Sequence, residues 1–169
     1  MQMKSTAQPP SYLDLDTQLC FALYSASLAM TKAYKPLLAE LGLTYPQYLV
    51  LLALWQHGPQ GVGELGERLF LDSGTLTPLT KRLQALGLLE RRRSTEDERH
   101  VELSLTAAGA SLRARAEAIP PCVLELSGCD LPTVESLTRK LQDLRGQLLA
   151  GAVSPTSAVI VPSSTMIPI

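Results

Sequence analysis

Three cysteines are the residues of this chain most able to do covalent chemistry, and they stand far apart at Cys20, Cys122 and Cys129. Such an odd and sparse set does not resemble the disulfide framework of a secreted domain. The two histidines, His57 and His100, lie far from every cysteine in sequence. We therefore expect no metal site and no cofactor. Taken alone, a lone cysteine is more often a small buried apolar residue than a reactive thiolate.

A second group of residues could bind an anion. Between Arg68 and Arg93 the chain has six basic residues and two acidic ones, although its formal net charge is −1. A local positive patch on a nearly neutral chain is typical of a surface that contacts nucleic-acid phosphates. The balance over the whole chain excludes a generally basic nucleic-acid coat.

The composition favours one mainly helical domain. The 169 residues are 46% hydrophobic and 18% charged, which is enough apolar material for a core and excludes global disorder. Leu and Ala dominate, and these residues favour helices. No apolar run is long enough to span a membrane, and residues 1–11 have no apolar stretch of the kind found in secretory signals. We expect a cytoplasmic protein that does not bind a membrane.

Helical periodicity and capping signals place the elements that must position these residues. A helix is expected over about 16–41, capped by Asp14 or Asp16 and ended by Gly42. Thr44 and Gln47 have the spacing of a capping box for the next helix, which should stop at Gly58. Further helices are expected over about 62–70, 73–86, 106–118 and 122–149, with a two-stranded hairpin at about 88–105 and a possible break in the last helix at 128–132.

The middle of the chain therefore predicts a helix-turn-helix followed by a β-hairpin wing. Hydroxyl residues near the start of the second helix could reach base edges or phosphates, or could simply cap the helix. At the hairpin tip, Asp97 could orient Arg99 toward a minor groove, unless this tip is only a solvated charged turn. The candidate DNA-binding residues are Ser73, Thr75, Thr77, Thr80, Lys81, Arg82, Arg93, Asp97 and Arg99.

The stretch DSGTLTPLTKRLQALGLLERRRSTEDERHVELSLTAAG resembles the winged helix-turn-helix of the MarR family. Its most specific element is Asp97-x-Arg99-x-Val101-x-Leu103-x-Leu105-Thr106. Upstream, LCFALY, YKPLL and LTYPQYLVLLALW stand in the order found in one subgroup, the organic hydroperoxide resistance regulators (OhrR). The resemblance covers roughly residues 12–149.

This resemblance implies a mainly α, dimeric MarR-like winged helix-turn-helix fold with a β-hairpin wing. It implies a repressor, not an enzyme, that binds a double-stranded DNA operator as a homodimer. An organic hydroperoxide would be its oxidant, and oxidation would release the operator of a peroxide-detoxification gene. The expected organisation is a flexible arm at 1–12, a MarR-type domain at 13–150 and a disordered tail at 151–169, with dimerisation helices at 13–43 and 107–150 around a DNA-binding part at 44–106.

Under the same resemblance, Cys20 is the redox-sensing thiol, and Tyr34 and Tyr45 support its thiolate. Fourteen residues of helix separate Cys20 from Tyr34, which is about 21 Å along a straight helix. A hydrogen bond between these two residues would therefore require a second subunit. Tyr24 and Tyr48 are expected to be core aromatics.

The resolving thiol would be Cys122, Cys129 or a low-molecular-weight thiol. Cys122 and Cys129 are seven residues apart and would share one helix face if the last helix were continuous. Three other functions remain open at this stage. They are a MarR-type regulator released by a small phenolic or lipophilic ligand, a thiol peroxidase, and a helical interaction protein that does not bind DNA.

Overall fold

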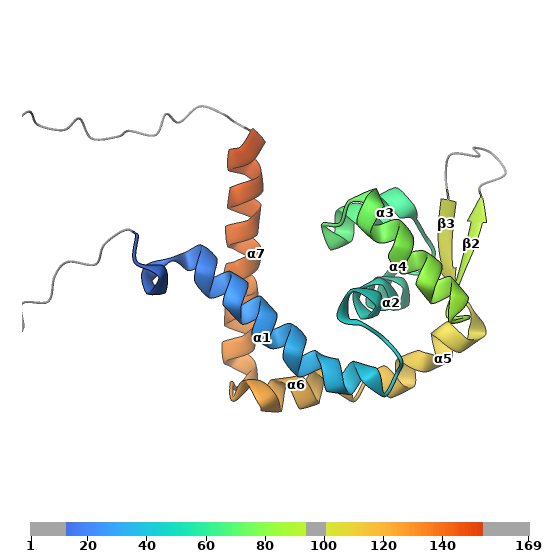
Figure 1. Ribbon diagram of the computed structural model, residues 1–169, viewed down its shortest axis with the longest axis horizontal. Helices are drawn as coiled ribbons and strands as arrows, with labels where there is room; N and C mark the ends of the chain where they lie inside the picture. Colours follow the sequence, from blue (N-terminus) through green and yellow to red (C-terminus); the bar gives the residue numbers. More distant parts are fainter. Residues whose placement is uncertain (1–12, 94–100, 154–169) are drawn as a thin grey trace, which may run out of the picture. The chain divides into compact units, whose positions relative to one another are not determined.

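The computed structural model describes residues 13–93 and 101–153, and the chain divides into two compact units after Leu126. It is mostly helical with one small antiparallel sheet, as predicted for the fold class (Figure 1). The elements are η1 (Leu15–Thr17), α1 (Leu19–Ala39), α2 (Tyr45–His57), β1 (Gln60–Gly61), α3 (Val62–Leu69), α4 (Ser73–Ala85), β2 (Leu89–Arg93), β3 (Val101–Leu105), α5 (Ala107–Ala116), α6 (Ile119–Ser127) and α7 (Leu131–Val153).

The ends of α2 follow the sequence signals. Gln47 Oε1 accepts hydrogen bonds from the backbone N–H of Thr44 at 2.8 Å and from the Thr44 hydroxyl at 3.1 Å. Pro46 lies in the first turn, where its missing N–H costs little. Gly58 ends the helix with φ +75°, a conformation that favours glycine.

The start of α1 differs from the prediction. The helix begins at Leu19, and Gln18 rather than Asp14 or Asp16 is its N-cap residue. The reason is a separate 3₁₀ turn before it, closed by hydrogen bonds from the Thr17 hydroxyl to the Asp14 carbonyl and from the Gln18 N–H to the Leu15 carbonyl. Gly42 follows the helix with φ +69°, as expected.

The wing is a three-stranded sheet rather than a simple hairpin. β2 and β3 pair antiparallel as predicted, with Leu89 opposite Leu105 and Arg93 opposite Val101. β1 pairs with the other edge of β3, giving the order β1-β3-β2. Two residues are too few for a period-2 pattern, so the sequence carried no signal for β1.

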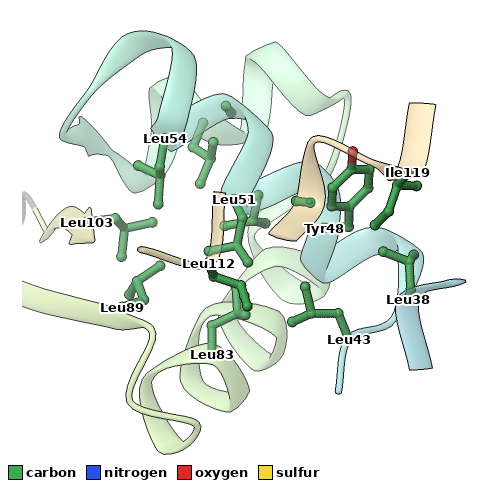
Figure 2. Packing of buried hydrophobic residues seen from close by; sticks show 14 of the residues in the cluster. Leu38, Leu43, Tyr48, Leu51, Leu54, Leu83, Leu89, Leu103, Leu112 and Ile119 are labelled. Atoms are coloured by element: carbon green, nitrogen blue, oxygen red, sulfur yellow. The ribbon is translucent and has the colours of Figure 1, made fainter. Parts of the chain in front are cut away.

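A single apolar core joins α2 to the helix-turn-helix and the wing. Tyr48, Leu51 and Leu54 of α2 are almost fully buried. Figure 2 shows their side chains gathered with those of Leu83 from α4, Leu89 and Leu103 from the sheet, and Leu112 and Ile119 from α5 and α6. Burying each leucine stabilises the fold by about 1.5–3 kcal/mol, so α2 is fixed to the elements around it.

The C-terminal helices depart from the prediction in two ways. Pro120 and Pro121 lie in the first turn of α6 rather than before it. Gly128, at φ +65°, lies between α6 and α7, so the last helix is broken where a break was considered possible. α7 continues to Val153, which corrects the expected disordered tail at its residues 151–153.

Among the described helices, none is long and apolar enough to cross a membrane.

Among the described glycines, Gly109 in α5 makes the closest approach to another backbone segment. A Cβ atom on this residue would overlap the carbonyl oxygen of Leu88, just before β2. The carbonyl of Gly109 also accepts a hydrogen bond from the Trp55 indole N–H at 2.9 Å. Glycine at this position therefore lets α5, α2 and the sheet meet.

We predict that Gly109→Ala lowers the free energy of unfolding by about 3 kcal/mol, because the methyl group forces the α5 backbone away from Leu88. Urea unfolding followed by circular dichroism measures this change. Gly63→Ala is the matched control, since a Cβ on Gly63 meets nothing within 4 Å in α3. The control should leave stability unchanged or raise it by about 0.5–1 kcal/mol. Equal stabilities for the two variants would contradict the packing argument.

Candidate functional site

A cluster of aromatic side chains forms where the end of α1 meets the start of α2. The rings of Tyr34 and Tyr45 have centroids 4.8 Å apart and planes tilted by 48°. Tyr48 lies 6.0 Å from Tyr34 and 6.3 Å from Trp55. The turn around Gly42 brings α2 back beside α1, so residues eleven apart in sequence stack within one protomer.

Burial raises the pKa values of the tyrosines in this cluster. It raises the pKa of Tyr34 above its usual value, and the neighbouring phenols of Tyr45 and Tyr48 raise it further. Burial likewise raises the pKa of Tyr45. Tyrosine phenols are protonated near neutral pH, and these upward shifts keep both phenols protonated to more alkaline pH, so both offer O–H donors. Two such donors on adjacent rings could stabilise an anion such as a thiolate.

Cys20 lies outside this cluster. Its side chain is exposed near the start of α1, fourteen residues before Tyr34. The rise of the helix places the two residues about 21 Å apart along its axis. The structure thus brings Tyr34 and Tyr45 together but does not bring Cys20 to them within one chain. Large apolar side chains on η1 and on the first turns of α1 are also exposed, namely Leu15, Leu19, Tyr24, Leu28 and Met30.

The two expected core tyrosines behave differently. Tyr48 is 2% exposed and belongs to the core, as predicted. Tyr24 is 62% exposed, so its assignment to the core was wrong. It lies in the part of α1 before the helix meets α2, where the described chain offers it no cover.

The other two cysteines lie on separate elements. Cys122 is exposed in the first turn of α6. Cys129 is half-buried in the turn after α6, where its N–H donates to the Ser127 hydroxyl at 3.2 Å. The idea that they share one helix face fails, because α6 ends at Ser127 and Gly128 turns the chain.

The helix-turn-helix has a well-formed joint. The N–H of Leu71 bonds to the carbonyl of Gly66 at 2.9 Å, and Phe70 adopts the left-handed conformation at φ +56°. Asp72 then caps α4 by accepting from the N–H of Thr75 at 2.8 Å and from its hydroxyl at 2.9 Å. These hydrogen bonds lower the pKa of Asp72 below its usual value, so its carboxylate stays ionised to more acidic pH than that of an ordinary aspartate.

One face of α4 is buried and the other is exposed and positively charged. Leu76, Thr80 and Leu83 are fully buried against the core. Ser73, Thr75, Lys81 and Arg82 are exposed, and Thr77 is half-buried.

Thr80 must be removed from the candidate DNA contacts, because its hydroxyl donates to the Thr77 carbonyl at 3.1 Å beneath the helix surface. Arg91 of β2 also donates to the Thr80 hydroxyl, at 3.4 Å. The other wing candidates are only partly placed. Arg93 ends β2, whereas Asp97 and Arg99 lie outside the described residues.

Sequence reasoning missed a polar junction between the end of α2 and α3. The buried Gln60 donates to the Ala53 carbonyl at 3.1 Å and accepts from Arg68 Nε at 3.0 Å. Arg68 also contacts His57 Nε2 at 3.0 Å and pairs with Glu64 at 3.2 Å. Arg68 therefore fixes the start of the helix-turn-helix to α2 and is not a freely available cation. A single glutamine in a polar loop gives no sequence signal for such a role.

Comparisons with known proteins agree with the geometry. Residues 32–115 match the family model of the transcriptional regulator SarA/Rot. The chain is 53% identical to the organic hydroperoxide resistance transcriptional regulator of Bacillus subtilis over 128 residues, which are 74% of this chain and 87% of that protein. It is 49% identical to the HTH-type transcriptional regulator TtmR of Methylorubrum extorquens, over 83% of this chain and 72% of that one.

Among solved structures, the chain is similar to reduced AbfR bound to DNA, with a TM-score of 0.67 and 35% identity over 80% of this chain and 94% of that one. AbfR has also been solved in an overoxidized form bound to DNA. A further structure shows AbfR with its disulfide formed, and here the TM-score is 0.56, with 35% identity over 83% of this chain and 93% of that one.

The raised pKa values of Tyr34 and Tyr45 predict a dependence of stability on alkaline pH. The folded chain keeps these phenol protons above about pH 10, where the unfolded chain loses them. Their contribution to stability is therefore complete below pH 10 and is lost as the pH rises through the folded pKa values.

We expect the double variant Tyr34→Phe/Tyr45→Phe to lose stability less steeply than wild type between about pH 9 and pH 11. Urea unfolding at a series of pH values measures both slopes. If the two chains lose stability in parallel over this range, burial does not hold the phenols protonated.

Proposed function

The chain belongs to the MarR family of winged-helix transcriptional regulators, in its organic hydroperoxide resistance subgroup, and on this basis we propose that it is a peroxide-sensing repressor. In the reduced state it binds a double-stranded DNA operator as a homodimer. Oxidation of Cys20 by an organic hydroperoxide releases the operator and derepresses a detoxification gene. Each thiol is used once as a signal and is not a centre of turnover. We place this activity in the cytoplasm, where thiols are kept reduced.

The proposal rests on the distance between Cys20 and the pair formed by Tyr34 and Tyr45 within one protomer. Tyr34 and Tyr45 stack at 4.8 Å within one protomer, while Cys20 stands exposed far along the same helix. The Cys20 of one subunit therefore meets the tyrosine pair of the other. We assign residues 13–43 and 107–150 to dimerisation, because α1 leaves large apolar side chains uncovered around Cys20 and a second copy would cover them.

The sensing reaction is the attack of the Cys20 thiolate, stabilised by the hydroxyl groups of the tyrosine pair, on the hydroperoxide. The Cys20 thiolate attacks the terminal oxygen of R–O–O–H, the O–O bond breaks, and the thiol becomes a sulfenic acid while an alkoxide leaves. The alkoxide takes a proton from solvent and departs as an alcohol. Hydrogen bonds from Tyr34 and Tyr45 stabilise the thiolate before the attack. A second thiol then displaces hydroxide from the sulfenic acid, giving a disulfide and water.

The resolving thiol comes from the partner subunit or from a small thiol in the cell. Cys122 is exposed in the first turn of α6. Cys129 is half-buried in the turn before α7. The two positions can be separated by substitution.

The DNA-binding face is the exposed side of α4 together with the wing. Ser73 and Thr75 stand at the N-terminus of α4, and Lys81 and Arg82 are exposed further along it. A helix N-terminus and cations both favour phosphate, and the half-buried Thr77 borders the same side. Arg93, Asp97 and Arg99 of the wing complete the set that we assign to DNA.

Release of DNA follows from symmetry. The two α4 helices of a dimer must lie about 34 Å apart to enter successive major grooves. A disulfide to Cys20 would pull the helices that set this spacing. A shift of a few ångströms would then weaken binding, because affinity depends on both half-sites engaging at once.

A second candidate function has one observation in its favour. A cavity of about 280 Å³ lies between α2 and the α5–α6 region, with Tyr48, Leu52 and Trp55 among its lining residues. An apolar cavity with an aromatic wall could take a small phenolic or lipophilic ligand. Under that alternative Cys20 would be structural.

A mobility shift on the operator tests the proposal. Reduced wild type should bind, release on addition of an alkyl hydroperoxide and rebind after a thiol reductant. Cys20→Ser should bind equally well and stay bound. Cys122→Ser and Cys129→Ser, tested in the same way, identify the resolver, because the variant lacking it should not form the disulfide. If wild type and Cys20→Ser both bind and neither responds to peroxide, the sensor function is excluded and the ligand-released alternative takes its place.

A further inference from the structure

A cavity beside Tyr45 has the chemistry of a site for an anionic amphiphile. It measures about 370 Å³ and lies between the last turns of α1 and the start of α2. This size is within the range of small-molecule sites. Ala39, Leu43, Tyr45 and Pro46 supply most of its apolar lining, and Lys32 and Lys35 of α1 also line it.

Neither lysine forms an ion pair with an acidic side chain within residues 13–93 and 101–153. They are exposed and three residues apart on α1, so they lie on neighbouring positions of one helix face. The ion pairs found within the described residues use Arg68, Arg92 and Arg113 and involve neither lysine. The acidic residue nearest to them in sequence, Glu40, does not line the cavity. Two like charges at the edge of an apolar cavity favour a ligand with an anionic head and an alkyl body.

Tyr45 belongs both to this cavity and to the tyrosine pair that we assign to the thiolate. This residue lines the cavity and also stacks on Tyr34 at 4.8 Å. A molecule held in the cavity therefore lies against one of the two phenols that support the thiolate. No such role could be assigned from the sequence, in which the two lysines are ordinary surface residues of a helix.

We propose that Lys32 and Lys35 determine which hydroperoxides this chain senses, by binding the carboxylate of oxidants that carry one. The inference rests on the proposed function and deepens it. The alkyl chain lies on Ala39, Leu43 and Pro46, and the peroxide group lies beside Tyr45, where the partner's Cys20 reaches it. The thiolate attacks the terminal peroxide oxygen, the O–O bond breaks, and the product alcohol leaves with its carboxylate unchanged.

The test compares three oxidants of Cys20 in reduced wild type and in Lys32→Gln/Lys35→Gln. The oxidants are an 18-carbon fatty-acid hydroperoxide, its methyl ester and tert-butyl hydroperoxide, each below the concentration at which micelles form. Loss of the thiol and trapping of the sulfenic acid are followed in time. Lys140→Gln is the matched control, because it removes an exposed lysine from α7.

In wild type and the control, the acid should oxidise Cys20 about tenfold faster than its ester, the factor expected for one charge-assisted hydrogen bond. In the double variant the acid and the ester should react at equal rates, while tert-butyl hydroperoxide reacts as in wild type. Decanoate should compete with the acid in wild type and should not compete in the double variant.

Two negative results are distinguishable. If all three oxidants leave Cys20 reduced in wild type, the proposed function fails and this inference fails with it. If tert-butyl hydroperoxide oxidises Cys20 but the acid has no advantage over the ester, or keeps its advantage in the double variant, only the role of the lysines is overturned.

Discussion

The rise of an α-helix is the constraint on which the proposed sensor depends. Cys20 and Tyr34 belong to one continuous helix, α1, and a helix rises 1.5 Å per residue, so these side chains cannot meet within a protomer. The same helix brings Tyr34 to Tyr45 only because the chain reverses at Gly42 and α2 returns beside it. One chain thus holds the two phenols that we assign to the thiolate site and the Cys20 thiol, but it does not bring them together. Under the proposed function, dimerisation is therefore a chemical requirement for sensing as well as a means of binding a symmetric operator.

The structure also explains how a change at that site could reach DNA. α2 carries Tyr45 and Tyr48 at one end, and its middle packs into the core with α4 and the sheet. Its other end is bound to α3 through Gln60 and Arg68. The tyrosines, the helix-turn-helix and the base of the wing therefore belong to one packed body, because a close-packed interior transmits displacement rather than absorbing it. A covalent pull on α1 would move this body as a whole.

The sequence predicted the elements whose signals are local. The capping box of Thr44 and Gln47, the glycine that ends α2 and the alternation in β3 each depend on a few neighbouring residues. It could not predict features decided by distant partners. Thr80 looked like a groove contact until the packing of α4 buried it, and β1 exists only because β3 offers an edge. The start of α1 was misplaced because a short 3₁₀ turn used the residues that would otherwise cap the helix. The cavity beside Lys32 and Lys35 is also lined by residues at the start of α2. The periodicity of one helix cannot predict which other element packs against it.

The assembly of the sensor from two subunits is tested most directly with a heterodimer. One subunit carries Cys20→Ser and keeps its tyrosines, and the other carries Tyr34→Phe/Tyr45→Phe and keeps Cys20. The measurement is the rate at which an alkyl hydroperoxide oxidises the single Cys20, compared with the homodimer of the tyrosine variant. We expect the heterodimer to react at the wild-type rate per thiol, because its Cys20 meets the intact tyrosines of the other subunit. The homodimer should react more slowly by a factor of about ten or more. A heterodimer as slow as that homodimer would contradict the account.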